Sequence, residues 1–331
     1  MLRSEAGDDP ARMAAVLKGI RVYQEAPRTR PMRRARVIAR RGRVTLRDYG
    51  GEGPLVVFIP SVINGSDILD LDRDRSLMRW LRGQGVHPML VDWGAPSGGE
   101  GALSLAGHVE KFLLPLLSRL PDPPIIAGYC LGGTLATALA QLMPCRGLAL
   151  IAAPWRFSGF PPQSRLRLAE LWESARAPAE QIGLLPMEVT QSAFWQLDPV
   201  RTLAKFETFG RKANDRKTLA SFTAVEDWAN DGPPMPFAAA REMMEDFFGR
   251  DLPGESGWRV GGQVIDPSSL ACPVLEIVST TDRIVPHASA AGVGDRITLR
   301  LGHVGMIVSG QAKEMAWQPL LQWLSQAQQL C

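Results

Sequence analysis

Short apolar runs alternate with helical patterns along most of this 331-residue chain, and this alternation limits the fold more than any other feature. The runs at 55–60 (LVVFIP) and 147–153 (GLALIAA) are apolar at nearly every position, which is typical of strands buried on both faces. Buried strands that alternate with helices form βαβ units and a mostly parallel sheet. We therefore predict an α/β fold with helices on both faces of the sheet.

The expected elements follow one another regularly, except in one long segment. Strands are predicted at 55–60, 87–93, 124–129, 147–153, 273–279 and 296–301. Helices are predicted at 9–24, 73–83, 103–120, 131–142 and 312–329. Between about 155 and 270 the rhythm stops, and Pro, Trp, Phe and Met recur at irregular intervals. Because long connections within one sheet are more often functional than accidental, we predict a cap inserted before the next strand.

Composition indicates an ordinary globular enzyme, with 45% hydrophobic and 21% charged residues. No run reaches the roughly 18 apolar residues that could span a bilayer. The polar, acidic N-terminus lacks the apolar segment of a signal peptide, so a cytoplasmic location is expected. We divide the chain into an arginine-rich extension at 1–45 and a catalytic domain at 46–331.

The extension and the first residues after it contain a dense group of arginines. One explanation is a solvated arm or the exposed face of an entry strand. The other is contact with phosphates, either of a nucleotide-bearing cofactor or of nucleic acid. No aromatic residues are interleaved with the arginines, so we expect no nucleic acid partner. The nine arginines are at positions 28, 30, 33, 34, 36, 40, 41, 43 and 47.

The four cysteines have different contexts, and their spacing does not suggest a disulfide framework or a metal site. Cys145 follows a proline and Cys272 precedes one, so both are expected to be buried structural thiols at element edges. Cys331 is the last residue and is expected to fray. Cys130 differs from all three because a strand precedes it and a helix follows it.

The residues around Cys130 read Gly-Tyr-Cys-Leu-Gly-Gly, from Gly128 to Gly133. A strand, this pattern and a helix together indicate a nucleophile elbow, a sharp turn that lifts one side chain above the sheet. The glycines are needed where a Cβ would collide with the neighbouring strand or helix. A thiol at a helix start also lies at the positive end of the helix dipole, which favours the attacking thiolate. The alternative is a glycine-rich turn with a structural cysteine, which the suitable partners downstream disfavour.

An acid and a base are expected after later strands of the sheet. Asp282 follows the strand at 273–279, and His303 follows the last strand. The order nucleophile, acid, base is that of the α/β-hydrolase fold. The other three histidines fit less well: His87 begins a strand, His108 lies inside a helix, and His287 follows a proline in the loop of the acid.

These positions predict a catalytic triad. His303 would take the thiol proton and later exchange a proton with the attacking hydroxyl, while Asp282 orients the imidazole. The backbone N–H groups of Leu131 and Val62 are the predicted donors of the oxyanion hole. Val62 is chosen because it lies in the loop after the strand at 55–60.

From about Leu55 to the C-terminus, the chain resembles the polyhydroxyalkanoate synthases, particularly their shorter, two-component type. The cysteine-containing box at 128–133 carries the resemblance together with several spaced motifs. These motifs are Pro60–Asn64, Leu69–Leu71, Asp74–Leu77, Val91–Gly94, Trp228–Gly232, Asp282–Pro286, Gly302–Gly305 and Val308–Gly310.

The resemblance implies that the cysteine accepts a 3-hydroxyacyl group from coenzyme A as a thioester, and that a chain-end hydroxyl then extends the polyester. It implies no tightly bound cofactor, with acyl-coenzyme A as substrate. The partners it suggests are an activating subunit or a second copy, and the surface of a polyester granule. Polymerisation requires the exclusion of water, which an apolar cap would provide. The cap aromatics that could supply it, or could simply pack in a core, are Trp155, Phe157, Phe160, Trp195, Phe206 and Trp228.

Two other functions stay open. A cysteine-dependent hydrolase of esters or thioesters would use the same scaffold, with water in place of the hydroxyl. A non-catalytic, granule-associated subunit would have no need of all three triad residues, so it is the weaker alternative.

Overall fold

The computed structural model describes residues 9–28, 32–197, 199–212 and 215–327. Its centre is an eight-stranded sheet with the order β1-β2-β4-β3-β5-β6-β11-β12. All neighbouring strands from β4 to β12 are parallel, whereas the β1–β2 and β2–β4 pairs are antiparallel. The predicted, mostly parallel sheet is therefore confirmed. The strands are β1 (Arg36–Arg41), β2 (Val44–Asp48), β3 (Leu55–Ile59), β4 (His87–Asp92), β5 (Ile125–Tyr129), β6 (Gly147–Ile151), β11 (Val274–Ser279) and β12 (Asp295–Leu299).

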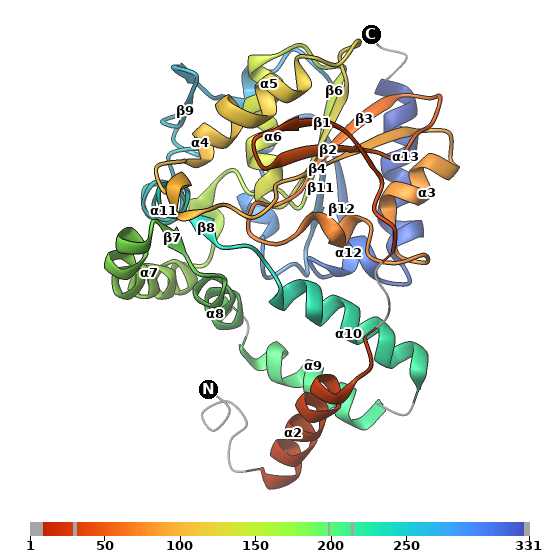
Figure 1. Ribbon diagram of the computed structural model, residues 1–331, viewed down its shortest axis with the longest axis vertical. Coiled ribbons are helices and arrows are strands. Elements are labelled where there is room, and N and C mark those ends of the chain that lie inside the picture. The colour runs from red at the N-terminus through yellow and green to blue at the C-terminus, as the bar shows by residue number, and fades with distance from the viewer. Residues whose placement is uncertain (1–8, 29–31, 198, 213–214, 328–331) are drawn as a thin grey trace.

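Helices cover both faces of this sheet (Figure 1). On one face lie α3 (Leu77–Gly83) and α13 (Gln318–Ala327), and on the other lie α4 (Leu105–His108), α5 (Leu114–Leu117) and α6 (Leu131–Leu142). The rings of Trp80 in α3 and Trp317 in the π-helical turn η8 (Lys313–Trp317) are 5.5 Å apart, which joins the helices of the first face. No helix among the described residues is long and apolar enough to cross a membrane.

Three predicted helices differ in their limits. The helix expected at 73–83 begins at Leu77, because the Ser76 side chain caps it by accepting a hydrogen bond from the N–H of Arg79 (3.0 Å). The helix expected at 103–120 is divided by the π-helical turn η3 (Val109–Leu113) just before Pro115, which has no N–H to donate. The helix expected at 312–329 consists of η8 and α13, and its last two residues lie outside the described residues, as does Cys331.

Residues 36–48 form a hairpin at one edge of the sheet, and the boundary predicted after residue 45 falls within its second strand. In β2, Val44 and Leu46 are fully buried in the core. In β1, Arg36 and Arg40 are exposed. Charged side chains on an edge strand discourage pairing with another chain, which explains why so basic a segment can form a strand here.

The segment between β6 and β11 forms the cap. Its helices are α7 (Pro162–Ile182), α8 (Met187–Leu197), α9 (Pro199–Lys212), α10 (Arg216–Asn230), α11 (Phe237–Arg241) and the π-helical η5 (Glu242–Gly249), with a short turn η4 (Phe157–Gly159) before them. Short two-stranded pairs accompany them: β7 (Leu184–Leu185) with β8 (Met235–Pro236), and β9 (Arg259–Val260) with β10 (Gln263–Val264).

The N-terminal helix α2 (Pro10–Glu25) packs on this cap rather than on the sheet, and Figure 1 shows it beside α9. The two backbones approach closely: a Cβ at Gly19 would lie 2.0 Å from the carbonyl oxygen of Phe206, and one at Gly210 would lie 2.4 Å from that of Ala15. The Tyr23 hydroxyl also donates to Asp227 in α10 (2.8 Å). Residues far apart in sequence thus build one helical layer.

Candidate active site

Cys130 lies at the sharp turn between β5 and α6. Its backbone has φ 55° and ψ −135°, a strained conformation for a residue with a side chain. A Cβ at Gly128 would lie 2.3 Å from the Cα of Gly133, and one at Gly132 would lie 2.2 Å from the carbonyl oxygen of Ile59. The turn therefore has the strain and the crowding that a nucleophile elbow requires.

Asp282 and His303 meet next to this turn, each from the loop after its strand. His303 Nδ1 lies 2.7 Å from Asp282 Oδ2, and both side chains are almost completely buried. The other carboxylate oxygen of Asp282 accepts hydrogen bonds from the N–H groups of Ile284 (2.9 Å) and Val285 (3.0 Å). Because an ionised carboxylate can only accept, Nδ1 carries a proton and Nε2 is left to interact with the thiol.

The surroundings of His303 favour its charged form. Burial alone would lower the pKa of His303, but the Asp282 charge, followed by the charge of Cys130 and hydrogen bonds to both residues, raises it to about 10. The ring of Tyr129 stacks on the imidazole with a centroid distance of 5.1 Å. The site can therefore hold an imidazolium between a carboxylate and a sulfur atom.

The other histidines lie elsewhere. His87 Nε2 is 2.7 Å from Asp48 Oδ1, and His287 begins the short turn η7 (His287–Ser289). His108 is buried, with Nδ1 2.7 Å from the carbonyl oxygen of Ser104 and Nε2 2.9 Å from an Arg43 nitrogen. Among the described residues, two cavities beside Cys130 are lined by His303 and by none of the other three histidines.

The two predicted oxyanion donors belong to segments in close contact. Leu131 is the first residue of α6, and the first N–H groups of a helix have no partner within it. Val62 lies just beyond Pro60, whose carbonyl oxygen accepts from the Trp93 indole N–H (3.0 Å). The near-contact of Gly132 with the end of β3 brings this loop to the start of α6. The role of Leu131 and Val62 stays a prediction.

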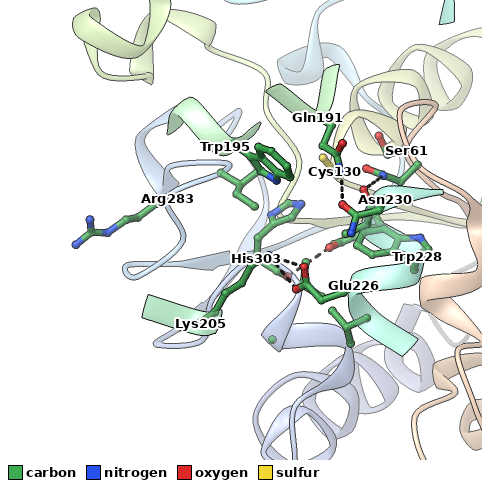
Figure 2. Close-up of a pocket in the computed structure, with 17 residues that line it drawn as sticks. Ser61, Cys130, Gln191, Trp195, Lys205, Glu226, Trp228, Asn230, Arg283 and His303 are labelled. Atoms are coloured by element: carbon green, nitrogen blue, oxygen red, sulfur yellow. Dashed lines mark hydrogen bonds and ion pairs between the residues drawn. The ribbon is translucent and has the colours of Figure 1, made fainter. Parts of the chain in front are cut away.

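A cavity of about 340 Å³ opens beside Cys130 and His303. Figure 2 shows side chains of the cap facing the nucleophile across it. Lys205 of α9 donates to both carboxylate oxygens of Glu226 in α10 (2.8 and 2.7 Å), and Gln191 of α8 donates to Asn230. The Glu226 side chain is only 7% exposed, so this is a largely buried ion pair in the wall of the site.

Sequence reasoning did not identify Lys205, Glu226 or Gln191, which no local pattern sets apart. It did single out the motif that contains Trp228 and Asn230, both of which line the cavity. The Trp228 indole N–H donates to the carbonyl oxygen of Gly65 (2.7 Å), so this motif ties the cap to the loop after β3. The motif could have been read as a contact between cap and core.

Several of the nine N-terminal arginines form ion pairs within the chain. Ion pairs join Arg28 to Asp227, Arg34 to Asp67, Arg43 to Glu100 and Arg47 to Asp92. Arg30 lies outside the described residues. These pairs explain much of the arginine density by internal contacts, and phosphate binding stays an untested alternative.

The remaining described cysteines lie away from the site. Cys145 and Cys272 precede the neighbouring parallel strands β6 and β11, and their sulfur atoms are 3.4 Å apart. Neither is part of a disulfide, and both are half-buried rather than fully buried as expected. Cys130 follows the opposite, carboxyl end of its own strand, so this thiol pair and the nucleophile occupy opposite edges of the sheet.

The geometry of the elbow and the order of its partners define the class of protein. Residues 56–316 match the Alpha/beta hydrolase family, and the chain belongs to that family. Solved structures with the same fold include BpoC of Mycobacterium tuberculosis (TM-score 0.52, 15% identity, 90% of this chain and 99% of that one). A structure reported for the metagenome-derived lipolytic enzymes LipS and LipT has the same fold (TM-score 0.51, 16% identity, 85% of this chain and 97% of the matched chain).

Within this family, the chain is similar to proteins named poly(3-hydroxyalkanoate) polymerase subunit PhaC, which confirms the resemblance found in the sequence. The protein of Haloferax mediterranei is 25% identical over 287 residues, which cover 82% of this chain but only 58% of the relative. Those of Thiocystis violacea (26%) and Synechocystis (25%) are matched over 81% and 80% of their lengths, and over 82% and 84% of this chain.

Proposed function

We propose that this chain is an acyltransferase of the polyhydroxyalkanoate synthase type, which transfers 3-hydroxyacyl groups from coenzyme A through Cys130 onto a growing polyester. The observation that carries the proposal is the buried Asp282–His303 pair beside a cysteine at the elbow. The names of the curated relatives, all polymerase subunits, support the polyester product and a partner subunit. A cytoplasmic, granule-associated location belongs to the same proposal.

In the first half-reaction, the Cys130 thiolate attacks the carbonyl carbon of the acyl-coenzyme A. The N–H groups of Leu131 and Val62 donate hydrogen bonds to the oxyanion that forms. When the intermediate collapses, the bond to the coenzyme A sulfur breaks, and the His303 imidazolium gives its proton to that sulfur. The products are a Cys130 thioester and free coenzyme A, with His303 neutral.

In the second half-reaction, neutral His303 takes the proton of a chain-end hydroxyl, whose oxygen attacks the thioester. The carbon–sulfur bond breaks, the ester forms, and the thiolate–imidazolium pair is restored. Asp282 stabilises the imidazolium in both halves. A thioester formed from another thioester is close to it in free energy, so the acyl group stays ready for transfer.

The experiment that tests the proposal mixes purified protein with 3-hydroxybutyryl-coenzyme A and follows coenzyme A release, the acyl product and the mass of the protein. Release together with insoluble polyester, abolished in Cys130→Ala, supports a synthase. Release with free 3-hydroxybutyrate alone indicates the alternative, a cysteine-dependent hydrolase. We also expect Cys130→Ser to lose most activity, and near-full activity in that variant would contradict the thiolate mechanism.

Absence of coenzyme A release beyond one equivalent per protein separates the remaining cases. An acyl adduct on Cys130 without turnover indicates a missing partner subunit, which the relatives' designation as subunits makes the first component to add. Absence of an adduct in the presence of a matched partner subunit would overturn the proposed substrate. Granule binding that survives in Cys130→Ala while no variant shows chemistry would favour the non-catalytic alternative.

A further inference from the structure

A second cavity, smaller and apolar, also opens at Cys130. Its volume is about 50 Å³, and it is lined by the nucleophile, by Leu131 and by side chains of the cap. Besides the Cys130 thiol, Thr190 contributes the one polar side chain among the described residues that line it. The Thr190 hydroxyl donates to the carbonyl oxygen of Pro186, just before its own helix (3.4 Å). Apart from the thiol, the described residues that line this cavity therefore offer a ligand no unpaired polar side chain.

Three phenylalanine rings give this cavity a stiff wall. Phe248 of η5 packs edge-on against Phe157 and Phe160, with both centroid distances 5.0 Å. The turn that carries Phe157 is fixed by Asp251, whose two carboxylate oxygens accept from the N–H groups of Phe157 (2.7 Å) and Ser158 (2.9 Å). A wall of interlocked rings on a bonded turn resists expansion, so the size of the cavity is a property of the folded cap.

The larger cavity is also mainly apolar, but it offers polar partners that the smaller one lacks. Ser61, Gln191, Asn230 and the Lys205–Glu226 pair contribute polar atoms to its lining, and it also contains His303. Cys130 and Ile284 line both cavities, so an acyl group on the sulfur lies where they meet.

We infer that the smaller cavity binds the alkyl substituent at carbon 3 of the acyl group on Cys130, an inference that rests on the proposed function. Carbon 3 of a 3-hydroxyacyl group carries both a hydroxyl and an alkyl substituent. The hydroxyl belongs in the larger cavity beside His303, which offers it polar partners, because burying it without a partner in the smaller cavity would be costly. The alkyl group then enters the apolar cavity.

The volume sets the length of that substituent. A cavity of about 150 Å³ accommodates benzene, with six carbons, so about 50 Å³ accommodates roughly two carbons. Methyl and ethyl substituents fit, as in 3-hydroxybutyryl and 3-hydroxyvaleryl groups. The pentyl substituent of a 3-hydroxyoctanoyl group does not fit while Phe248 and Phe160 keep their places. Because each surplus methylene in an apolar pocket alters the rate by about tenfold or more, we expect a preference of at least about 100-fold for the shorter groups.

The test measures acylation of Cys130 by each of the three coenzyme A thioesters, from intact mass and coenzyme A release. Phe248→Leu, which enlarges the cavity, should raise the relative rate of the octanoyl substrate about tenfold. Phe247→Leu is the matched control, since Phe247 neighbours it in η5 and packs on Phe157 but does not line the cavity. In the opposite direction, Ala193→Leu fills the cavity from α8 and should slow the valeryl substrate more than the butyryl one.

The outcomes separate this inference from the proposed function. If Cys130 is acylated equally by all three substrates, or if Phe248→Leu and Phe247→Leu change the ratio alike, the inference fails while acyl transfer stands. Nitrophenyl butyrate and octanoate, measured on the same variants, test the cavity without coenzyme A or polymer. If the esters show the predicted selection while the thioesters give no adduct, the cavity assignment stands and the proposed substrate falls. If neither the thioesters nor the esters acylate Cys130, both are overturned.

Discussion

The charge of Asp282 should set both the rate of Cys130 acylation and its dependence on pH. The pKa of His303 is raised from 6.5 to about 10, a difference worth ~5 kcal/mol in favour of the imidazolium. Asp282 provides the largest of the interactions that raise it, ahead of Cys130. In Asp282→Asn we therefore expect the pKa of His303 to fall by at least about 2 units, which corresponds to ~3 kcal/mol and a roughly 100-fold slower acylation.

The same substitution should change the imidazole tautomer. The asparagine oxygen can still accept from the N–H groups of Ile284 and Val285, which leaves its NH₂ group facing Nδ1 of His303. Two donors cannot share a hydrogen bond, so the neutral ring moves its proton to Nε2, toward the thiol. A ring in that form cannot take a proton from the chain-end hydroxyl, and the second half-reaction should slow as well.

The assay follows coenzyme A release from 3-hydroxybutyryl-coenzyme A between pH 6 and 10.5. In the unaltered protein, the rate of acylation should decline only near pH 10, where the imidazolium loses its proton. In Asp282→Asn this decline in the rate of acylation should occur at a pH closer to neutral. Asp295→Asn, at an exposed position in the neighbouring strand β12, is the matched control. If Asp282→Asn is acylated within about threefold of the rate of the unaltered protein, and its rate still declines only near pH 10, this electrostatic reasoning is refuted.

Three further predictions test the packing of the fold. Gly132→Ala should cost ~2 kcal/mol or more and slow acylation, because its Cβ would lie 2.2 Å from a carbonyl oxygen of β3, whereas Gly83→Ala meets nothing within 4 Å and should leave thermal melts and adduct formation unchanged. Burial lowers the pKa of His108 to about 4, so the unfolded state binds the extra proton, and stability should fall by up to ~3 kcal/mol as pH drops from about 6.5 to about 4. The free energy of unfolding from urea melts should show this dependence on pH, and the dependence should vanish in His108→Gln. Lys205→Met leaves Glu226 buried without its partner and should lower the free energy of unfolding by ~2 kcal/mol, while Lys205→Arg should retain most of it.

The sheet and the candidate triad could be predicted because their signals are local. A buried parallel strand is apolar along its length, and the elbow needs glycine where a Cβ would meet a neighbouring backbone, as at Gly128 and Gly132. Asp282 and His303 follow from the rule that the carboxyl ends of parallel strands share one edge. The strands and the elbow are read from a few adjacent residues, and the acid and base require only this general rule about parallel sheets.

The cap wall could not be predicted, because its contacts join positions without a shared pattern. Lys205 and Glu226 lie on different helices and look in the sequence like ordinary surface charges. Likewise, nothing around Gly19 indicates that α2 docks on α9 rather than on the sheet. The arginine density is compatible with a solvated arm and with the exposed face of an entry strand, so the sequence alone does not decide whether this segment joins the sheet.

The strained backbone conformation at Cys130 is stabilised by hydrogen bonds that connect three neighbouring strands. Cys130 and Ala152 both have positive φ, 55° and 46°, and such conformations cost ~1–3 kcal/mol each. The N–H of Cys130 donates to the carbonyl oxygen of Ile151 at the end of β6 (3.0 Å), and the N–H of Ala152 donates to that of Ile277 in β11 (2.8 Å). Strand β11 also leads into the loop of Asp282. The register that positions the acid therefore supports the turn that carries the nucleophile, and a shift of β11 would disturb both at once.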